Sequence, residues 1–232
     1  MHIIERPSPN HGPRREGPVD ILLLHYTGMA SAAAALDRLR DPAAAVSSHY
    51  VVDEDGTVYR LVDEARRAWH AGAAFWAGTH DVNSRSIGIE LVNPGHEFGY
   101  PPFPPAQMAA LAALAGGVLA RHPIPRHRVL GHSDVAPGRK RDPGEKLDWA
   151  WLAAHWIGLW PSPDAAVPTI DPAAGLSRIG YAVDDLPAAI TAFQRHWRPR
   201  LVDGLADDET RRRIAQIADL CPPPIDAEPP RA

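Results

Sequence analysis

Two histidines and an aspartate occupy positions from which three ligands could meet at one metal ion. His25 ends an apolar run, His132 follows a second apolar segment, and Asp142 lies ten residues beyond His132. Two imidazoles and a carboxylate, with a fourth position open, form a catalytic zinc set if the two segments end close together in space. The spacing is not that of a compact metal motif, so histidines buried for packing remain an alternative explanation at this stage.

A glutamate and a lysine are candidates for acid–base chemistry. Glu90 lies in SIGIEL, where the alternation of apolar and polar residues places Ser86, Gly88 and Glu90 on one face of a strand. If that face lines a cleft, Glu90 is a candidate general base; if it faces solvent, it has no such role. Lys140 lies in the charged segment GRKRDPG, which is an ordinary solvated loop unless Asp142 binds a metal and holds Lys140 near the reacting centre.

The elements that must position these residues alternate between strand and helix patterns. Strands are expected at 20–26, 86–91 and 127–131, with a hairpin around Asp55-Gly56, and helices at 31–40, 105–122 and 148–156. Residues 1–18, which are polar and rich in proline and glycine, are predicted to form an irregular arm. We therefore expect an α/β catalytic domain over 1–160, with a mixed β-sheet flanked by helices.

The last third of the chain has a different pattern. A proline-rich stretch at 161–173 predicts a linker. Apolar residues at helical spacing then predict a small helical domain over 174–221, with the tryptophan at 197 on the buried face of one helix. Residues 222–232 are predicted to form a disordered tail.

Composition excludes several classes of protein. The 232 residues carry a net charge of −4, which does not favour nucleic acid or anionic lipid as a partner, and the one cysteine, Cys221, excludes a disulfide framework. No apolar run approaches the roughly 18 residues of a membrane span. The first residues, MHIIERPSPNHGPRREG, lack the apolar core of a signal peptide. We therefore expect the cytoplasm, with a periplasmic location as the alternative if a signal was removed.

Five segments occur in an order that resembles a known enzyme family. They are HYTG at 25–28, SSHYVVDEDGTVYRLV at 47–62, AWHAG at 68–72, NSRSIGIELVNPG at 83–95 and GHSDVAPGRKRDPG at 131–144. Together they resemble the zinc-dependent N-acetylmuramoyl-L-alanine amidases of the amidase-2 group, which are related to peptidoglycan recognition proteins. The resemblance covers roughly residues 18–160. Downstream, GY at 180–181, AFQRHWRP at 192–199 and GLADDET at 204–210 resemble a three-helix peptidoglycan-binding domain, as in two-domain members of the family.

The resemblance implies roles for the candidate residues. His25, His132 and Asp142 match the family's zinc ligands, and some relatives carry cysteine at the third position. Glu90 matches the catalytic glutamate and Lys140 the catalytic lysine. The implied cofactor is Zn²⁺.

Two further histidines match the family at positions where a structural role is an equal alternative. His70 matches a residue along the substrate cleft, and His49 is a second candidate for substrate binding. Phage-type members have a tyrosine directly before the histidine that matches His49. This chain has Ser48 there, so the role of that tyrosine is not implied.

The expected reaction is hydrolysis of the amide between N-acetylmuramic acid, or its 1,6-anhydro form, and L-Ala of a peptidoglycan stem peptide. A zinc-activated water would attack, and Glu90 would serve as the base. The expected partners are peptidoglycan fragments, and the expected role is muropeptide recycling. An envelope amidase that acts on polymeric wall and a peptidoglycan-binding protein without catalysis are the alternatives. The oligomeric state stays open.

Overall fold

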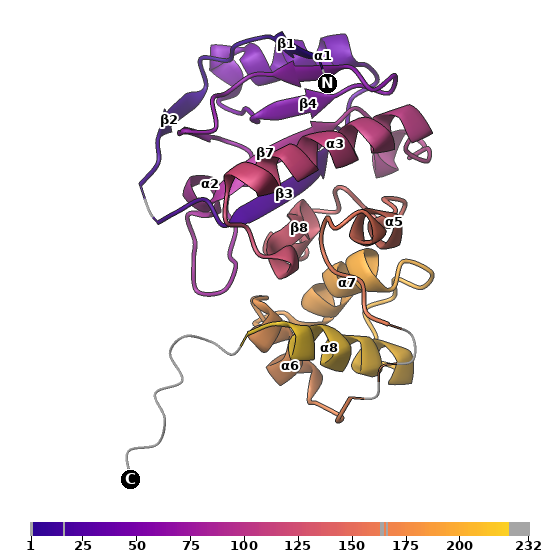
Figure 1. The fold of residues 1–232 in the computed structure, drawn as a ribbon. Helices are drawn as coiled ribbons and strands as arrows, with labels where there is room; N and C mark the ends of the chain where they lie inside the picture. Colours follow the sequence, from indigo (N-terminus) through magenta and orange to yellow (C-terminus); the bar gives the residue numbers. More distant parts are fainter. Residues whose placement is uncertain (1, 16, 163–164, 166, 223–232) are drawn as a thin grey trace.

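A six-stranded mixed sheet, with strand order β1-β5-β4-β7-β3-β8, forms the centre of the N-terminal part of the protein (Figure 1). The computed structural model describes residues 2–15, 17–162, 165 and 167–222. The strands of this sheet are β1 Ile3–Glu5, β3 Ile21–Tyr26, β4 Tyr50–Val52, β5 Val58–Arg60, β7 Ser86–Leu91 and β8 Val129–Gly131. The β4–β5 hairpin is antiparallel and the other pairs are parallel, so the predicted α/β class with a mixed sheet is confirmed.

Helices flank the sheet and make up the C-terminal part. The helices are α1 Ala32–Arg40, α2 Val82–Arg85, α3 Pro105–Arg121, α4 His132–Val135, α5 Trp149–Ala154, α6 Pro172–Ile179, α7 Leu186–Trp197 and α8 Asp208–Leu220. Short 3₁₀ turns lie at Pro42–Ala44, His96–Phe98 and Arg126–Arg128. The predicted helix at 31–40 is confirmed with its cap, since the Ser31 side chain accepts a hydrogen bond from the backbone N–H of Ala34.

The central position of β3 in the sheet explains why its sequence, from Ile21 to Leu24, is apolar without interruption. It pairs with β7 on one side and β8 on the other, and both faces of the sheet are covered there. Leu22 and Leu24 belong to the apolar cluster that includes α3. Ile21 and Leu23 point to the opposite face and belong to a second cluster, which also contains residues of the C-terminal helices.

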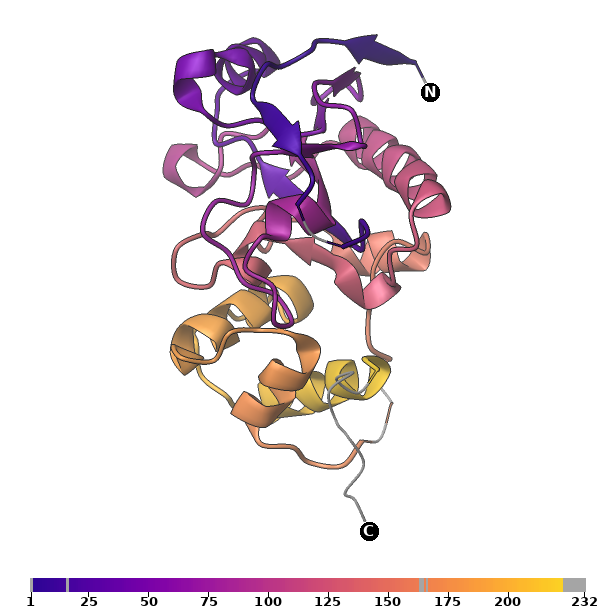
Figure 2. The same ribbon diagram turned by 90° about the vertical axis from the view of Figure 1, so that its left-hand side faces the viewer.

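The C-terminal helices α6, α7 and α8 form the expected three-helix unit, which lies next to β8 and α5 (Figures 1 and 2). Helix α6 begins at Pro172, with Asp171 as its cap, which is two residues before the boundary that we predicted at 174. Residues 223–232 of the tail predicted at 222–232, and residues 163, 164 and 166 of the predicted linker, lie outside the described residues. Because this unit shares a buried apolar cluster with the sheet, its helices are packed against the rest of the chain.

Two local predictions were wrong. The N-terminal arm is not irregular, because β1 pairs with β5 and a second strand, β2 His11–Pro13, pairs antiparallel with β6 Arg66–Ala68. Edge pairing of this kind uses backbone groups and requires no alternation of side chains. The helix predicted at 148–156 is shorter than expected, because α5 ends at Ala154 and Trp156 lies beyond it, 75% exposed.

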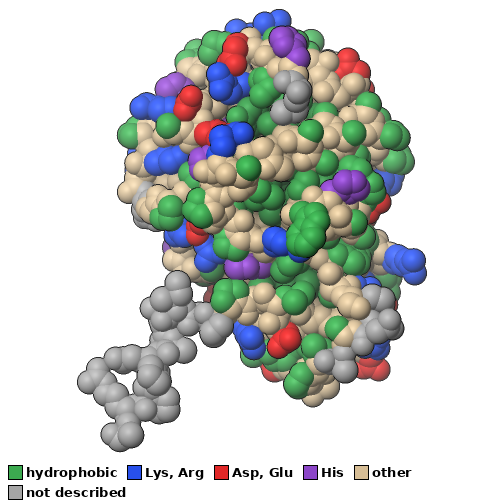
Figure 3. Space-filling view, viewed as in Figure 1, with side chains coloured by type: hydrophobic (Ala, Val, Ile, Leu, Met, Phe, Trp, Pro, Cys, Tyr) green, Lys and Arg blue, Asp and Glu red, His purple; other side chains and the backbone are tan. Residues whose placement is uncertain are grey.

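The surface agrees with the low net charge. On the face seen in Figure 3, Lys and Arg side chains lie interspersed with Asp and Glu. In the described part of the chain, no helix has the length and apolar character needed to cross a bilayer.

Candidate metal centre and active site

His25, His132 and Asp142 come together at the carboxyl ends of two neighbouring strands. The Nδ1 atoms of His25 and His132 lie 3.0 Å apart, and the Oδ2 atom of Asp142 lies 3.0 Å from each of them. All three residues are buried, with exposed fractions of 1%, 3% and 7% in this order. They form a group that could hold a metal ion.

The strand register explains this convergence of distant residues. Leu24 of β3 lies opposite Gly131, the last residue of β8, and the residue that follows each of them in the chain is a ligand candidate: His25 on β3 and His132 at the start of α4. The loop after α4 returns Asp142 to the same place, where its carbonyl accepts a hydrogen bond of 2.9 Å from the backbone N–H of Ser133. Gly131 leaves room for this loop, because a Cβ there would lie 2.7 Å from Cδ of Pro143.

Hydrogen bonds on the far side of each ring determine which nitrogen faces the centre. Nε2 of His132 lies 2.9 Å from the carbonyl oxygen of Ala71 and must donate to it. Nε2 of His25 lies 3.1 Å from Nδ1 of His70, while Nε2 of His70 lies 3.3 Å from Oγ of Ser86. The Ser86 hydroxyl donates to a carbonyl oxygen, so one consistent chain of donors runs outward from His25. Both Nδ1 atoms are therefore left without a proton, as metal ligands require.

The electrostatics of the group fit a cation. Burial and the neighbouring His132 lower the pKa of His25 to about 4, so its ring is neutral at neutral pH. Two nitrogen lone pairs and a carboxylate oxygen thus face one another. For a tetrahedral ion about 2.0–2.1 Å from each ligand, neighbouring ligand atoms are about 3.3 Å apart, which is close to the 3.0 Å found here.

Glu90 lies beside this centre on the next strand. It is directly opposite His25 in the register of β3 and β7, and both residues line one cleft of about 430 Å³. One carboxylate oxygen, Oε2, is buried and has no hydrogen-bond partner among the described residues. Burial, reinforced by the charge of Asp142, raises the pKa of Glu90 well above its usual value, while Lys140 opposes the shift. A carboxylate in this environment is a strong acceptor for a proton.

Lys140 and His70 also line the cleft, and His49 does not. The ring of His70 covers Gly88 so closely that a Cβ at Gly88 would lie 2.6 Å from it. In the buried His49, the Nδ1 atom accepts a hydrogen bond from the backbone N–H of Gly88. Its Nε2 atom lies 3.1 Å from the carbonyl oxygen of Arg66. Both nitrogens of His49 are thus occupied by backbone groups, which is the environment of a structural histidine.

Several residues of the cleft wall give no signal in the sequence. Arg38 of α1 and the loop arginines Arg139 and Arg141 bring positive charge to it. Tyr26 and His96 also line it and are joined by a contact of 2.9 Å between the Tyr26 hydroxyl and Nδ1 of His96. A polar residue on an amphipathic helix or a charged loop gives no signal that separates a cleft from open solvent, so these positions could not be found from their pattern.

Comparisons with known proteins agree with this geometry. The family model Amidase_2, N-acetylmuramoyl-L-alanine amidase, matches residues 15–145. The N-acetylmuramoyl-L-alanine amidase AmiD of Escherichia coli is 38% identical over 223 residues, covering 83% of this chain and 80% of AmiD. The 1,6-anhydro-N-acetylmuramyl-L-alanine amidase AmpD of Enterobacter cloacae is 38% identical over 106 residues, which cover 46% of this chain and 54% of AmpD.

Solved structures give the same result over most of the fold. E. coli AmiD, in complex with anhydro-N-acetylmuramic acid-L-Ala-D-gamma-Glu-L-Lys, matches with a TM-score of 0.79 and 35% identity, covering 89% of this chain and 93% of that one. AmpDh3 of Pseudomonas aeruginosa, in complex with an anhydromuramic pentapeptide, matches with a TM-score of 0.80 and 32% identity over 90% of this chain and 94% of that one. These matches confirm the resemblance seen in the motifs, and the chain belongs to the N-acetylmuramoyl-L-alanine amidase family.

Proposed function

We propose that this protein hydrolyses the amide bond between N-acetylmuramic acid, or its 1,6-anhydro form, and L-Ala of peptidoglycan stem peptides. The observation that carries the proposal is the meeting of two Nδ1 atoms and a carboxylate oxygen beside the half-buried Glu90, whose buried Oε2 atom has no hydrogen-bond partner among the described residues. The relatives are amidases by name, and two of them bind anhydromuramic peptides in their solved complexes. We therefore take small muropeptides as the substrate class and recycling of wall fragments as the role.

His25, His132 and Asp142 would hold the cofactor, for which the donor set of two imidazoles and one carboxylate favours zinc. When bound, Zn²⁺ would polarise the scissile carbonyl and lower the pKa of the attacking water. His70 keeps the ring of His25 in the required orientation through the contact to its Nε2. This assigns His70 a positioning role beside its place in the cleft wall.

Glu90 would move the proton in this reaction. Its carboxylate takes a proton from the attacking water as the new C–O bond forms. It then delivers that proton to the nitrogen of L-Ala as the C–N bond breaks, so that the products are a free amine and a lactyl carboxylate. Lys140 would donate hydrogen bonds to the oxyanion of the tetrahedral intermediate. A lost donor of this kind costs roughly 3–4 kcal/mol in comparable sites.

The test uses the purified protein with two substrates, an anhydromuramyl peptide and purified wall sacculi, each with and without a chelator. We expect the small substrate to release a peptide with a free L-Ala amine, which mass spectrometry detects, and we expect the chelator to stop this release. His25→Ala, His132→Ala and Asp142→Ala should lose both zinc and turnover, whereas His155→Ala, at an exposed histidine, should keep both. Full activity in a ligand variant would overturn that assignment.

The second substrate separates two biological settings. Cleavage of the small peptide alone supports recycling of soluble fragments, which we propose takes place in the cytoplasm. Cleavage of sacculi as well would instead favour an envelope enzyme. Binding of both substrates without cleavage of either would favour a recognition protein and refute the proposed reaction.

A further inference from the structure

A buried aspartate links the C-terminal helices to the turn that carries His132. Asp134 is 0% exposed and lies in α4, two residues after His132. Its Oδ2 atom accepts a hydrogen bond of 2.7 Å from the backbone N–H of Gly131, and Nδ1 of His196 lies 2.7 Å from the same oxygen. Its Oδ1 atom accepts a hydrogen bond of 2.5 Å from the hydroxyl of Tyr181. Of the three partners that this carboxylate has in the described part of the chain, two therefore come from the C-terminal unit.

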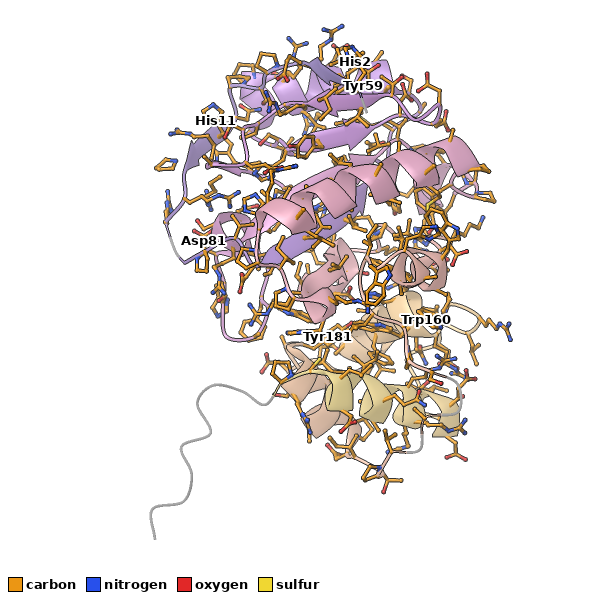
Figure 4. All side chains as sticks on the ribbon, viewed as in Figure 1. His2, His11, Tyr59, Asp81, Trp160 and Tyr181 are labelled. Carbon is orange, nitrogen blue, oxygen red and sulfur yellow. The ribbon has the colours of Figure 1, made fainter. Side chains whose placement is uncertain are left out.

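Both of these partners are held in place by aromatic contacts. The ring of Tyr181 packs edge to face on Trp76 with 4.9 Å between ring centroids, and it lies at the junction between the two parts of the molecule (Figure 4). The ring of His196 is stacked between Trp149 and Trp197, with centroid distances of 3.7 and 3.6 Å. Burial beside Asp134 raises the pKa of Tyr181 well above its usual value, so its hydroxyl stays protonated and donates. The contacts define a fixed geometry around the carboxylate.

The C-terminal unit reaches His132 by two routes. On one side, the bond from Gly131 to Asp134 closes the turn on which α4 begins, and this turn sets the backbone of His132. On the other side, Nε2 of His132 donates to the carbonyl of Ala71, at the start of the loop that the unit also contacts. In that loop, the backbone N–H of Ala77 donates to the carbonyl of Gly180 at 2.8 Å.

We propose that Tyr181 and His196 are positioning residues for the metal site, acting through Asp134 on the orientation of His132. This inference rests on the proposed function, in which His132 is a metal ligand. It assigns the C-terminal helices a part in building the active site. Outer partners of metal ligands typically change metal affinity 10–100-fold when they are lost. Because Asp134 acts through the backbone of His132, we expect the lower end of that range, about 10-fold.

The experiment compares the same substitution at two buried tyrosines, each of which donates a hydrogen bond from its hydroxyl to a carboxylate. Tyr181→Phe removes the hydroxyl that donates to Asp134. Tyr50→Phe, the matched control, removes a hydroxyl that donates to Glu64 at 2.7 Å, on a buried tyrosine of β4 that does not line the cleft. Zinc affinity is measured by competition with a chelator, at a temperature where each full-length variant is folded. Co²⁺ spectra of the same variants report the ligand geometry directly.

We expect Tyr181→Phe to bind zinc about 10-fold more weakly and to alter the Co²⁺ spectrum, while Tyr50→Phe matches the wild type in both even if it is less stable. His196→Phe, which keeps the stacked ring but removes the Nδ1 donor, should behave like Tyr181→Phe and decides the matter if that variant does not fold. Wild-type affinity and an unchanged spectrum in the folded variants would refute this inference alone. A wild-type protein that binds no zinc would refute the proposed function as well.

Discussion

Replacing Glu90 with glutamine should change stability and catalysis in opposite directions. In the metal-free protein, Glu90 has a raised pKa, so the native state binds more protons than the unfolded chain between the two pKa values. Stability therefore falls as the pH rises from about 4.3, the value in unfolded chains, through the native pKa. Glutamine has nearly the same shape and no charge, so the variant does not have this pH-dependent loss. Metal-free Glu90→Gln should thus be more stable than the wild type at pH 8 and equal to it at pH 4.

The magnitude follows from the single unpartnered oxygen. Glutamine leaves a polar atom at the same place, so the variant removes only the cost of the buried charge. A cost of about 1–3 kcal/mol shifts the melting temperature of a chain of this size by about 2–4 °C per kcal/mol. With zinc present, the loss of a general base should lower kcat/KM by about 10²–10⁴, which corresponds to about 3–5 kcal/mol. The assays are thermal unfolding in chelator across pH and hydrolysis of an anhydromuramyl peptide.

A control variant tests whether the effects are specific to Glu90, and two outcomes would contradict the prediction. Glu54→Gln, the same change at an exposed glutamate in the β4–β5 turn, should alter neither quantity. A Glu90→Gln protein that is less stable at pH 8 would show that the carboxylate is paired in solution. A rate within 10-fold of the wild type would show that another group serves as the base.

Three further changes test the surroundings of the site. Gly88→Ala should weaken zinc binding about 10-fold in chelator competition, because its Cβ would lie 2.6 Å from the His70 ring; unchanged affinity would remove His70 from the positioning of His25. For Glu64, burial raises the pKa, but hydrogen bonds from tyrosine, arginine and histidine neighbours outweigh it and lower the pKa to about 2. Its contribution to stability should be complete above about 4.5 and disappear as the pH falls to about 2, and acid titration of Glu64→Gln should show a shallower loss. Truncation after Ser162 should expose the shared apolar cluster and abolish soluble expression; a soluble, monomeric product would contradict that packing.

The parts of the fold that the sequence predicted are those encoded in local patterns. The apolar run 20–26 marks a strand buried on both faces, and the Asp55-Gly56 pair marks a hairpin turn, because each depends on neighbouring residues alone. The alternation in SIGIEL likewise placed Glu90 opposite the face that its isoleucines bury. The N-terminal strands β1 and β2 escaped prediction because short edge strands bury little and need no apolar alternation.

The arrangement of the site depends on contacts that no local pattern records. The motif GHSDVAP contains Asp134, yet two of its hydrogen-bond partners lie 47 and 62 residues away along the chain. The packing of the C-terminal helices against the sheet was similarly hidden, since their apolar faces predict burial but not the surface that buries them. The sequence pattern shows which residue types are present. The strand register and the packing of the apolar core determine which of these residues come into contact.

The two candidate histidine ligands are 107 residues apart in sequence, and this separation bears on whether the fold would need a bound metal. In small zinc domains whose ligands are close in sequence, the ion is required for the chain to fold. Here His25 lies near the end of the central strand β3 and His132 directly follows the neighbouring strand β8, and both strands are held by apolar clusters on the two faces of the sheet. We therefore expect the fold not to depend on a bound ion, so that a metal at this site could be removed and restored, or exchanged for another, while the protein stays folded.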